Sequence, residues 1–495
     1  MSLFSTKPIA RILRESEGGE HQLKRTLGPV NLVALGIGAI IGAGLFAITP
    51  VATHDNAGPA VVFSFLIAAV GCAFAGMCYS EFATMIPIAG SAYTYAYATM
   101  GELLAWIIGW DLVLEYAVGA ATVSVSWSSY LVRLLGHFGI TLPPRLTASP
   151  FDAMGGGHGL VNLPAIFIIC AISIILMIGI SESAWVNGLI VALKVTIVVL
   201  VIGLGWAYID RANYVPFLPP NTGVTGHFGW SGVMRAAGMI FFAYIGFDAV
   251  STAAQEARTP KRDMPIGIIG SLAICTVLYV LFAYVMSGIV NYKDMTPTAI
   301  YDAINKTKYA WLSTGVIVGI LAGYTSVILV MLLGQSRVFF SMSRDGLLPK
   351  LFSDIHPKFR TPWRSNLLLM VFVSLFSGFL PISSLGNMTS IGTLLAFVIV
   401  CAGVMVMRRT QPNLPRPYKT PLVPLVPILG ILVCFGMMAF LDIMTWIRLV
   451  VWLVIGFVVY FGYSRYHSHL VTDPELAHSK LAQTKLGQPR TPARS

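Results

Sequence analysis

Charged side chains are scarce in this sequence. Only 11% of its 495 residues are Asp, Glu, Lys or Arg, whereas 56% are hydrophobic. An ordinary soluble chain has about a quarter of its residues charged. The shortage of charge excludes a soluble globular protein, and the long apolar runs in its place predict a membrane protein with many spans.

Cysteine and histidine are also sparse where chemistry would need them. The six cysteines all fall within apolar segments, away from the spacings of a disulfide framework or a zinc site, so we expect them to be small packing residues. No histidine falls in the middle of an apolar segment, which argues against a histidine proton relay or an intramembrane metal cluster. No dinucleotide fingerprint and no recurring set of nucleophile and base is found, so neither an enzyme nor a cofactor is expected.

Segments of about 20 apolar residues, the length of one membrane crossing, occur twelve times. The third segment is too long for one simple crossing and is expected to extend beyond the bilayer. The polar first 28 residues lack an apolar core with a cleavage site, so no cleaved signal peptide is expected. The segments lie near residues 29–50, 59–83, 93–132, 162–181, 184–209, 231–256, 266–290, 310–341, 365–383, 386–407, 423–441 and 445–464.

The formal net charge of +11 is distributed in a way that favours membrane topology. No basic stripe is interleaved with aromatic residues, so nucleic acid is not an expected partner. If the N-terminus is cytoplasmic, the inside segments hold 22 of the 32 Lys and Arg residues and the outside loops hold six. This excess predicts a multi-pass protein of the cell membrane with both termini in the cytoplasm.

Two membrane spans carry signals for an interruption near their middle. Four glycines occur within residues 36–44 of the first span, and in the sixth span Gly246 is followed by the acid Asp248. These spans correspond in two halves of five helices each, which is the best sequence pointer to a transporter binding site. The alternative is that Gly38 and Gly42 form a Gly-xxx-Gly pair that lets two helices pack closely.

An interrupted helix exposes backbone groups that can bind a ligand. If the first span breaks near residues 40–44, the amide groups that begin its outer half suit a carboxylate. Free carbonyl groups at the ends of the neighbouring half-helices suit an ammonium group. A site with both poles predicts a zwitterionic ligand, of which a free amino acid is the obvious small example.

Six segments together resemble the amino acid-polyamine-organocation superfamily and, within it, the bacterial relatives of the cationic amino acid transporters. The resemblance covers nearly the whole chain apart from its two tails. The matching segments are residues 36–46 (GIGAIIGAGLF), 87–97 (PIAGSAYTYAY), 101–116 (GELLAWIIGWDLVLEY), 241–252 (FFAYIGFDAVST), 256–265 (EARTPKRDMP) and 341–349 (SMSRDGLLP).

This resemblance implies an all-α integral membrane protein of the leucine-transporter fold with twelve spans, in which helices 1 and 6 are interrupted. The implied parts are a cytoplasmic segment at residues 1–28, inverted five-helix repeats at 29–209 and 231–407, helices 11 and 12 at 423–464, and a cytoplasmic tail at 465–495.

The family pattern also implies which residues bind the substrate. The carboxylate would lie on the amides of Ala43 and Gly44. Relatives often carry a hydroxyl residue where this chain has Ala43, so a side-chain hydrogen bond is lost there and affinity or substrate preference is expected to differ. The ammonium group would lie on carbonyl groups of the two interrupted helices, those of Ile40, Phe242, Ala243 and Ile245.

Lys194 lies near the middle of the fifth span, too deep to reach water comfortably. A charge at such a depth is expensive and indicates a functional site. In sodium-coupled proteins of this fold a cation bridges helices 1, 5 and 8, and in several proton-coupled relatives a lysine of helix 5 takes its place. By this resemblance Lys194 is expected to gain and lose the coupling proton.

Three further polar positions carry two interpretations each. Asp111 and Glu115 stand four residues apart on one helix face. The resemblance suggests that Glu115 sets a preference for a cationic side chain, and the alternative is a polar network with neighbouring helices, backbone or tyrosines. Tyr324, in the eighth span, either lines the side-chain pocket or makes a hydrogen bond between helices.

Two other acids have structural interpretations. Asp248 is expected to orient its neighbours inside the interrupted sixth span. Glu81, near the cytoplasmic end of the second span, is expected either to be solvated or to form a gating ion pair with Arg25, Arg258 or Arg337.

The sequence therefore predicts a permease that imports amino acids by alternating access as a proton symporter. Its expected partners are an amino acid, protons and the lipid bilayer. The alternatives are an exchanger of amino acids or amines without ion coupling and, from another class, a membrane receptor or channel. The sequence leaves open whether the substrate is neutral or cationic, as well as the stoichiometry and the oligomeric state.

Overall fold

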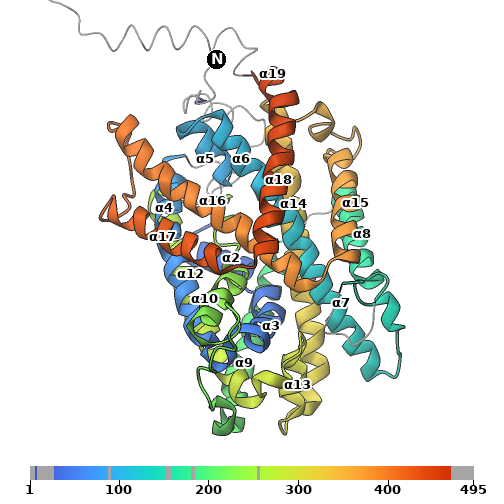
Figure 1. Ribbon diagram of the computed structural model, residues 1–495. Helices are drawn as coiled ribbons and strands as arrows, with labels where there is room; N and C mark the ends of the chain where they lie inside the picture. The colour runs from blue at the N-terminus through green and yellow to red at the C-terminus, as the bar shows by residue number, and fades with distance from the viewer. Residues whose placement is uncertain are drawn as a thin grey trace, which may run out of the picture.

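A computed structural model describes residues 6–7, 27–86, 91–151, 159–179, 184–252 and 257–469 of the chain. These residues form helices and the connections between them (Figure 1). No strand forms within the described ranges, where extended residues pair in one isolated bridge between Leu27 and Ala257. The prediction of an all-α protein is confirmed for this part of the chain.

The helices follow one another along the chain and are joined by connections of different lengths. The longer ones are α2 (Pro29–Ile40), α4 (Val61–Met85), α6 (Glu102–Val113), α7 (Gly119–His137), α8 (Leu163–Ile178), α9 (Ala184–Gly205), α10 (Gly229–Ile240), α12 (Pro260–Ile289), α14 (Ser313–Arg344), α15 (Trp363–Phe379), α16 (Ile382–Thr410), α17 (Leu425–Phe440) and α18 (Ile443–Val459). Shorter ones are α3 (Thr49–Ala52), α5 (Ser91–Thr99), α11 (Ala249–Thr252), α13 (Ala299–Asn305) and α19 (Arg465–His467).

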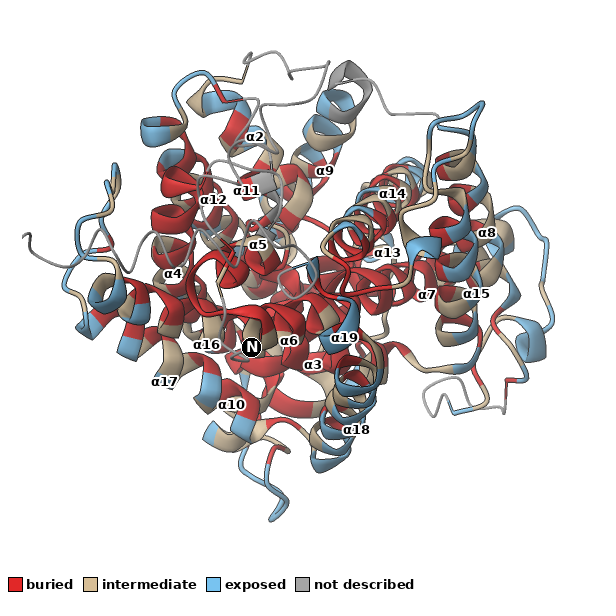
Figure 2. Ribbon diagram, turned by 90° about the horizontal axis from the view of Figure 1, so that it is seen from above, coloured by how far each residue is buried: buried red, intermediate tan, exposed pale blue. Residues whose placement is uncertain are grey.

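The outer surface of the helix assembly is apolar. Seven helical stretches of the described residues are long and apolar enough to cross a membrane, and α8, α15 and α17 are shorter apolar helices. Figure 2 shows a buried centre surrounded by helices such as α8, α15 and α18, whose outward faces are exposed. Those faces present side chains such as Phe167, Val371 and Val454, each more than half exposed. Contiguous apolar surface of this kind marks a protein embedded in a membrane.

The first span is interrupted in its middle, as predicted. Helix α2 starts with Pro29, which fits the first turn because its missing N–H would have no partner there. It ends at Ile40, and Ile41 has an extended backbone with ψ of 108°. The helix resumes as a π-helical turn, η1 (Gly44–Ile48). The interruption predicted near residues 40–44 is therefore confirmed.

The sixth span is interrupted as well. Helix α10 continues into a 3-10 turn, η8 (Phe241–Tyr244), after which Ile245 is extended with ψ of 138°. Gly246 follows with φ of 116°, a value that favours glycine over any residue with a side chain. The chain becomes helical again in α11. The prediction of an interruption around Gly246 is confirmed.

The prediction of one long third segment at residues 93–132 is wrong in its boundaries. The structure divides this region into the short helix α5 and a second stretch made of α6, the π-helical turn η4 (Leu114–Val118) and α7. The two are separated at Gly101, whose φ is 101°. A backbone of this kind cannot continue a right-handed helix, so the apolar run turns there.

Glu81 differs from both expectations for it. Its carboxylate is fully buried and accepts bonds at 3.1 and 2.7 Å from the guanidinium of Arg408 at the end of α16. Arg416 lies 3.4 Å from the same carboxylate, and the backbone N–H of Thr420 donates to it at 2.8 Å. Glu81 is thus neither solvated nor paired with the arginines predicted, because its partners come from the end of α16 and the connection after it, more than 320 residues later in the sequence.

The two ends of the described chain meet at the turn after α14. Lys7 donates to a carboxylate oxygen of Asp345 at 2.8 Å, and Tyr93 donates to the other oxygen at 2.7 Å. The backbone N–H of Lys7 bonds to the carbonyl of Tyr97 at 2.9 Å. The backbone N–H of His469 bonds to the carbonyl of Asp345 at 3.0 Å. Asp345 therefore contacts both the N-terminal and the C-terminal segment.

Candidate functional site

The interruptions of the first and sixth spans lie directly against each other. A Cβ atom added to Gly44 would lie 2.2 Å from the Cα atom of Ala243. A Cβ atom added to Gly246 would lie 2.7 Å from the carbonyl oxygen of Ala39. Both distances are shorter than any ordinary carbon contact, so only glycine lets the two backbones come this close.

Tyr279 of α12 joins the two interruptions. Its hydroxyl oxygen lies 2.9 Å from the carbonyl oxygen of Ile40 and 3.0 Å from that of Ala243. The hydroxyl has one proton and donates to one carbonyl at a time, whereas each carbonyl oxygen can accept two bonds. Two of the carbonyl groups predicted for an ammonium group therefore face one point in the structure. The carbonyl of Phe242 accepts the backbone N–H of Ile245 at 3.3 Å.

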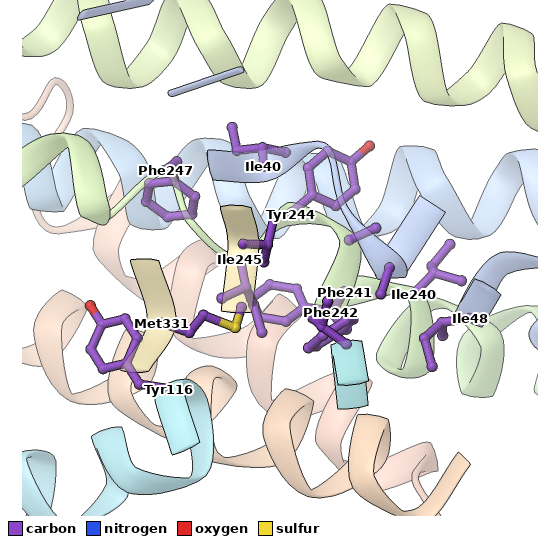
Figure 3. Packing of buried hydrophobic residues seen from close by; sticks show 14 of the residues in the cluster. Ile40, Ile48, Tyr116, Ile240, Phe241, Phe242, Tyr244, Ile245, Phe247 and Met331 are labelled. Carbon is purple, nitrogen blue, oxygen red and sulfur yellow. The ribbon is translucent and has the colours of Figure 1, made fainter. Parts of the chain in front are cut away.

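The side chains around this point are apolar and buried. Figure 3 shows Ile40, Phe242 and Ile245 from the interrupted segments together with Tyr116 of η4 and Met331 of α14. Each of these side chains is less than a tenth exposed. Ala43 and Gly44 are buried as well. The residues predicted to bind the substrate backbone are thus enclosed, with apolar side chains on several elements next to them.

Lys194 connects three helices close to the first interruption. It is 2% exposed, and its ammonium group donates to the carbonyl of Gly38 in α2 at 2.9 Å. A Cβ atom on Gly323 of α14 would lie 3.0 Å from Cε of Lys194, so α14 passes directly over the lysine stem. The first, fifth and eighth spans therefore meet at this buried lysine. Its acceptor, Gly38, stands two residues before the end of α2.

Three buried acids occur in this part of the sequence pattern: Asp248 in the sixth-span interruption, Glu115 in η4 and Asp111 in α6. Tyr116 donates to one carboxylate oxygen of Asp248 at 2.9 Å, and this bond joins η4 to the interrupted segment. Glu115 precedes Tyr116 in the π-helical turn η4, and such turns are frequent at functional sites. Glu115 lies within side-chain hydrogen-bonding reach of Asp248 and Thr393, whereas the carboxylate oxygens of Asp111 have no hydrogen-bond partner among the described residues. Polar contacts of the kind expected from the network interpretation are therefore seen around Glu115 and not around Asp111.

Tyr324 of α14 packs against the part of the first span that follows its interruption. Its ring centroid is 6.3 Å from that of Phe46 and 5.8 Å from that of Tyr130. Tyr130 in turn donates to the carbonyl of Phe46 at 3.1 Å. The hydroxyl of Tyr324 is buried and has no hydrogen-bond partner among the described residues. A bond from this hydroxyl to another helix, one of its two predicted roles, is not seen there.

Sequence reasoning missed Tyr279 and Gln335. Tyr279 sits in an apolar run of α12, where nothing local distinguishes it from a packing tyrosine. Gln335 of α14 is fully buried, and neither atom of its amide has a partner within the described part of the chain. A glutamine in an otherwise apolar span was a signal that the sequence did offer.

Comparisons with known proteins show which family the sequence matches. A family model described as amino acid permease matches residues 27–466. The chain is 44% identical over 473 residues to the branched-chain amino acid permease BcaP of Bacillus subtilis. The aligned region covers 95% of this chain and 99% of that protein. It is 41% identical to the methylthioribose transporter of the same bacterium, again over 95% and 99% of the two chains. It is 35% identical to the vacuolar cationic amino acid transporter 4 of Arabidopsis thaliana, over 83% of this chain and 68% of that one.

Proposed function

Since this chain belongs to the amino acid permease family, we propose that it is a proton-coupled importer of amino acids that works by alternating access. The observation that carries the proposal is the contact between two interrupted spans, with carbonyl groups of both directed at the Tyr279 hydroxyl. Membrane transporters bind substrates at such interruptions because the freed backbone groups line a cavity.

In the proposed architecture the chain crosses the cell membrane twelve times with both termini in the cytoplasm. The repeats at residues 29–209 and 231–407 each place an interrupted helix first, which supports an inverted pair. Helices α17 and α18 follow the second repeat. This arrangement puts the binding site at the interface of the two repeats.

The substrate is held through its backbone groups in this proposal. Its carboxylate lies at the start of the outer half of the first span, on the amides of Ala43 and Gly44. Its ammonium group lies among the carbonyls of Ile40, Phe242, Ala243 and Ile245. The pairing of Gly44 with Ala243 brings these two sets to one place.

Two features bear on the substrate side chain. Phe242, Ile245 and Met331 give the site apolar neighbours, which favours a branched-chain substrate like that named for the Bacillus relative. The buried carboxylate of Glu115, beside that of Asp248, favours a cationic substrate, like that named for the Arabidopsis relative. We propose that Glu115 and Tyr324 face the side-chain end of the substrate, and that Glu115 decides how well a cationic side chain is accepted.

Lys194 is the proposed proton carrier. A protonated lysine donates to the carbonyl of Gly38, whereas a neutral amine holds it less strongly because charge-assisted hydrogen bonds are stronger. Loss of the proton would loosen the contact between α9 and the inner half of the first span. The runner-up is an exchanger that needs no ion gradient.

The test is uptake of labelled isoleucine and labelled arginine into proteoliposomes. We expect an imposed inward proton gradient to drive accumulation of at least one of them and the Lys194→Ala variant to lose this drive. Counterflow between preloaded substrate and external label, without a gradient, should persist in the variant. Gradient-independent exchange in both proteins would favour the exchanger, and full pH-dependent uptake by the variant would remove Lys194 from the coupling mechanism.

A further inference from the structure

A lateral groove opens beside the first turn of α14, at the opposite end of that helix from Asp345 and Lys7. Eleven residues line it. Its walls are almost entirely apolar and come from four helices. They include Leu200 and Leu204 of α9, Ile289 of α12, Ala303 and Ile304 of α13, and Val316 of α14.

The groove opens on a surface that meets lipid. On α9 the neighbouring Leu193 and Val199 are exposed together with Leu200, which lines the groove. Just beyond, Trp206 and Trp311 are 53% and 75% exposed at the ends of α9 and α14. Exposed tryptophans of this kind gather at the boundary between hydrocarbon and headgroups. They place the groove in the hydrocarbon next to that boundary, where an acyl chain is the available apolar ligand.

Two cations flank the residues at the rim of the groove. Lys306 and Lys308 stand on either side of Thr307, which lines the groove together with Tyr309. Both lysines are exposed, and neither forms an ion pair within the described ranges. The nearby acid Asp302 is engaged elsewhere, since it accepts a bond from Thr296 at 2.8 Å and lies 3.7 Å from Arg133.

We propose that this groove binds an anionic phospholipid, with one acyl chain between α9, α13 and α14 and the phosphate at Lys306 and Lys308. The apolar walls fit the chain, and the two lysines at the level of the headgroups fit its negative charge. A zwitterionic lipid would keep the chain contact and lose most of the attraction to the lysines. The site involves none of the residues assigned to the amino acid, so it stands or falls independently of the proposed transport function.

Native mass spectrometry of the purified protein with added dioleoyl phosphatidylglycerol tests the proposal. We expect the wild type to retain this lipid about tenfold better than dioleoyl phosphatidylcholine, which has the same chains. The Lys306→Gln/Lys308→Gln double variant should lose that preference, whereas Lys293→Gln, an exposed lysine outside the groove, should keep it. Leu200→Trp should lower retention of both lipids by narrowing the groove, and Val199→Trp, one residue away, should not.

Three results would overturn the proposal. The first is equal retention of the two lipids by the wild type. The second is unchanged retention of phosphatidylglycerol in both the lysine double variant and Leu200→Trp. The third is displacement of the lipid by glycerol phosphate at equal concentration, since the groove would then contribute nothing. Should one variant fail to elute as folded protein, the other still decides the outcome.

Discussion

Replacing Tyr279 with Phe would test the backbone site most directly. The change removes the hydroxyl shared by the carbonyls of Ile40 and Ala243 and keeps the ring, which packs against Phe65 and Tyr244. Ile40 and Ala243 are 3% and 1% exposed, so water does not replace the lost donor. A buried acceptor left without a donor costs about 1–3 kcal/mol. We expect the empty protein to lose about this much free energy of unfolding.

A bound amino acid would restore part of that loss. Its ammonium group supplies donors to the same two carbonyls, so the ligand should stabilise Tyr279→Phe more than it stabilises the wild type. If the ammonium group recovers the full 1–3 kcal/mol, the dissociation constant of the variant falls by a factor of roughly 5–150. The expected result is therefore a less stable protein that binds its substrate more tightly.

Ligand-dependent thermal unfolding of the purified protein measures both quantities. The twenty amino acids are first screened on the wild type, and the one with the largest shift is used for the variants. Tyr244→Phe is the matched control, because Tyr244 stands in η8 but its hydroxyl donates at 3.2 Å to the carbonyl of Phe65 in α4 and to neither of the carbonyls shared by Tyr279. Binding by Tyr279→Phe that is equal to or weaker than binding by Tyr244→Phe would refute the assignment of the ammonium group to these carbonyls.

Three further predictions follow from the contacts. In the Glu115→Gln variant, competition by arginine for labelled substrate should weaken at least severalfold while competition by isoleucine stays unchanged; an unaltered arginine profile would exclude the specificity role. Gly44→Ala should abolish uptake because the added Cβ would lie 2.2 Å from the Ala243 backbone. The control Gly436→Ala, with nothing within 4 Å of the added atom, should transport normally. Equal activity of the two variants would contradict the close approach of Gly44 to Ala243. Glu81→Gln should cost about 3–5 kcal/mol in free energy of unfolding because it leaves Arg408 and Arg416 without their buried carboxylate. Asp354→Asn, which breaks the exposed pair with Arg364, should cost about 0–1 kcal/mol. Similar losses in the two variants would show that burial of the Glu81 pair is unimportant.

The interrupted helices could be predicted because their signals are local. The glycines of residues 36–44 and the Gly246–Asp248 pair stand within the segments that break, and correspondence between two halves of the chain reinforces each signal. Lys194 was equally visible, since a lone charge in the middle of an apolar run needs no partner to be noticed. Its contacts with Gly38 and Gly323 lie where the resemblance to sodium-coupled transporters implied.

Other features depend on contacts between distant parts of the chain, which one sequence does not reveal. Glu81 could not be matched to Arg408 and Arg416, because several arginines lie at the ends of spans and all are equally plausible partners. Tyr279 is one of 19 tyrosines, and only the fold selects it as the one between two interruptions. The split at Gly101 was hidden by an apolar run that continues through the turn.

The meeting of Lys7 and His469 at Asp345 constrains how the polypeptide can cross a bilayer. Lys7 and His469 touch the same residue, so they lie on one side of the membrane. A chain that leaves on the side from which it entered has crossed an even number of times. The described residues hold seven long apolar stretches, an odd number, so counting each as one passage cannot be the complete topology. Parity alone thus excludes a seven-pass receptor-like arrangement, whichever amino acid the protein carries.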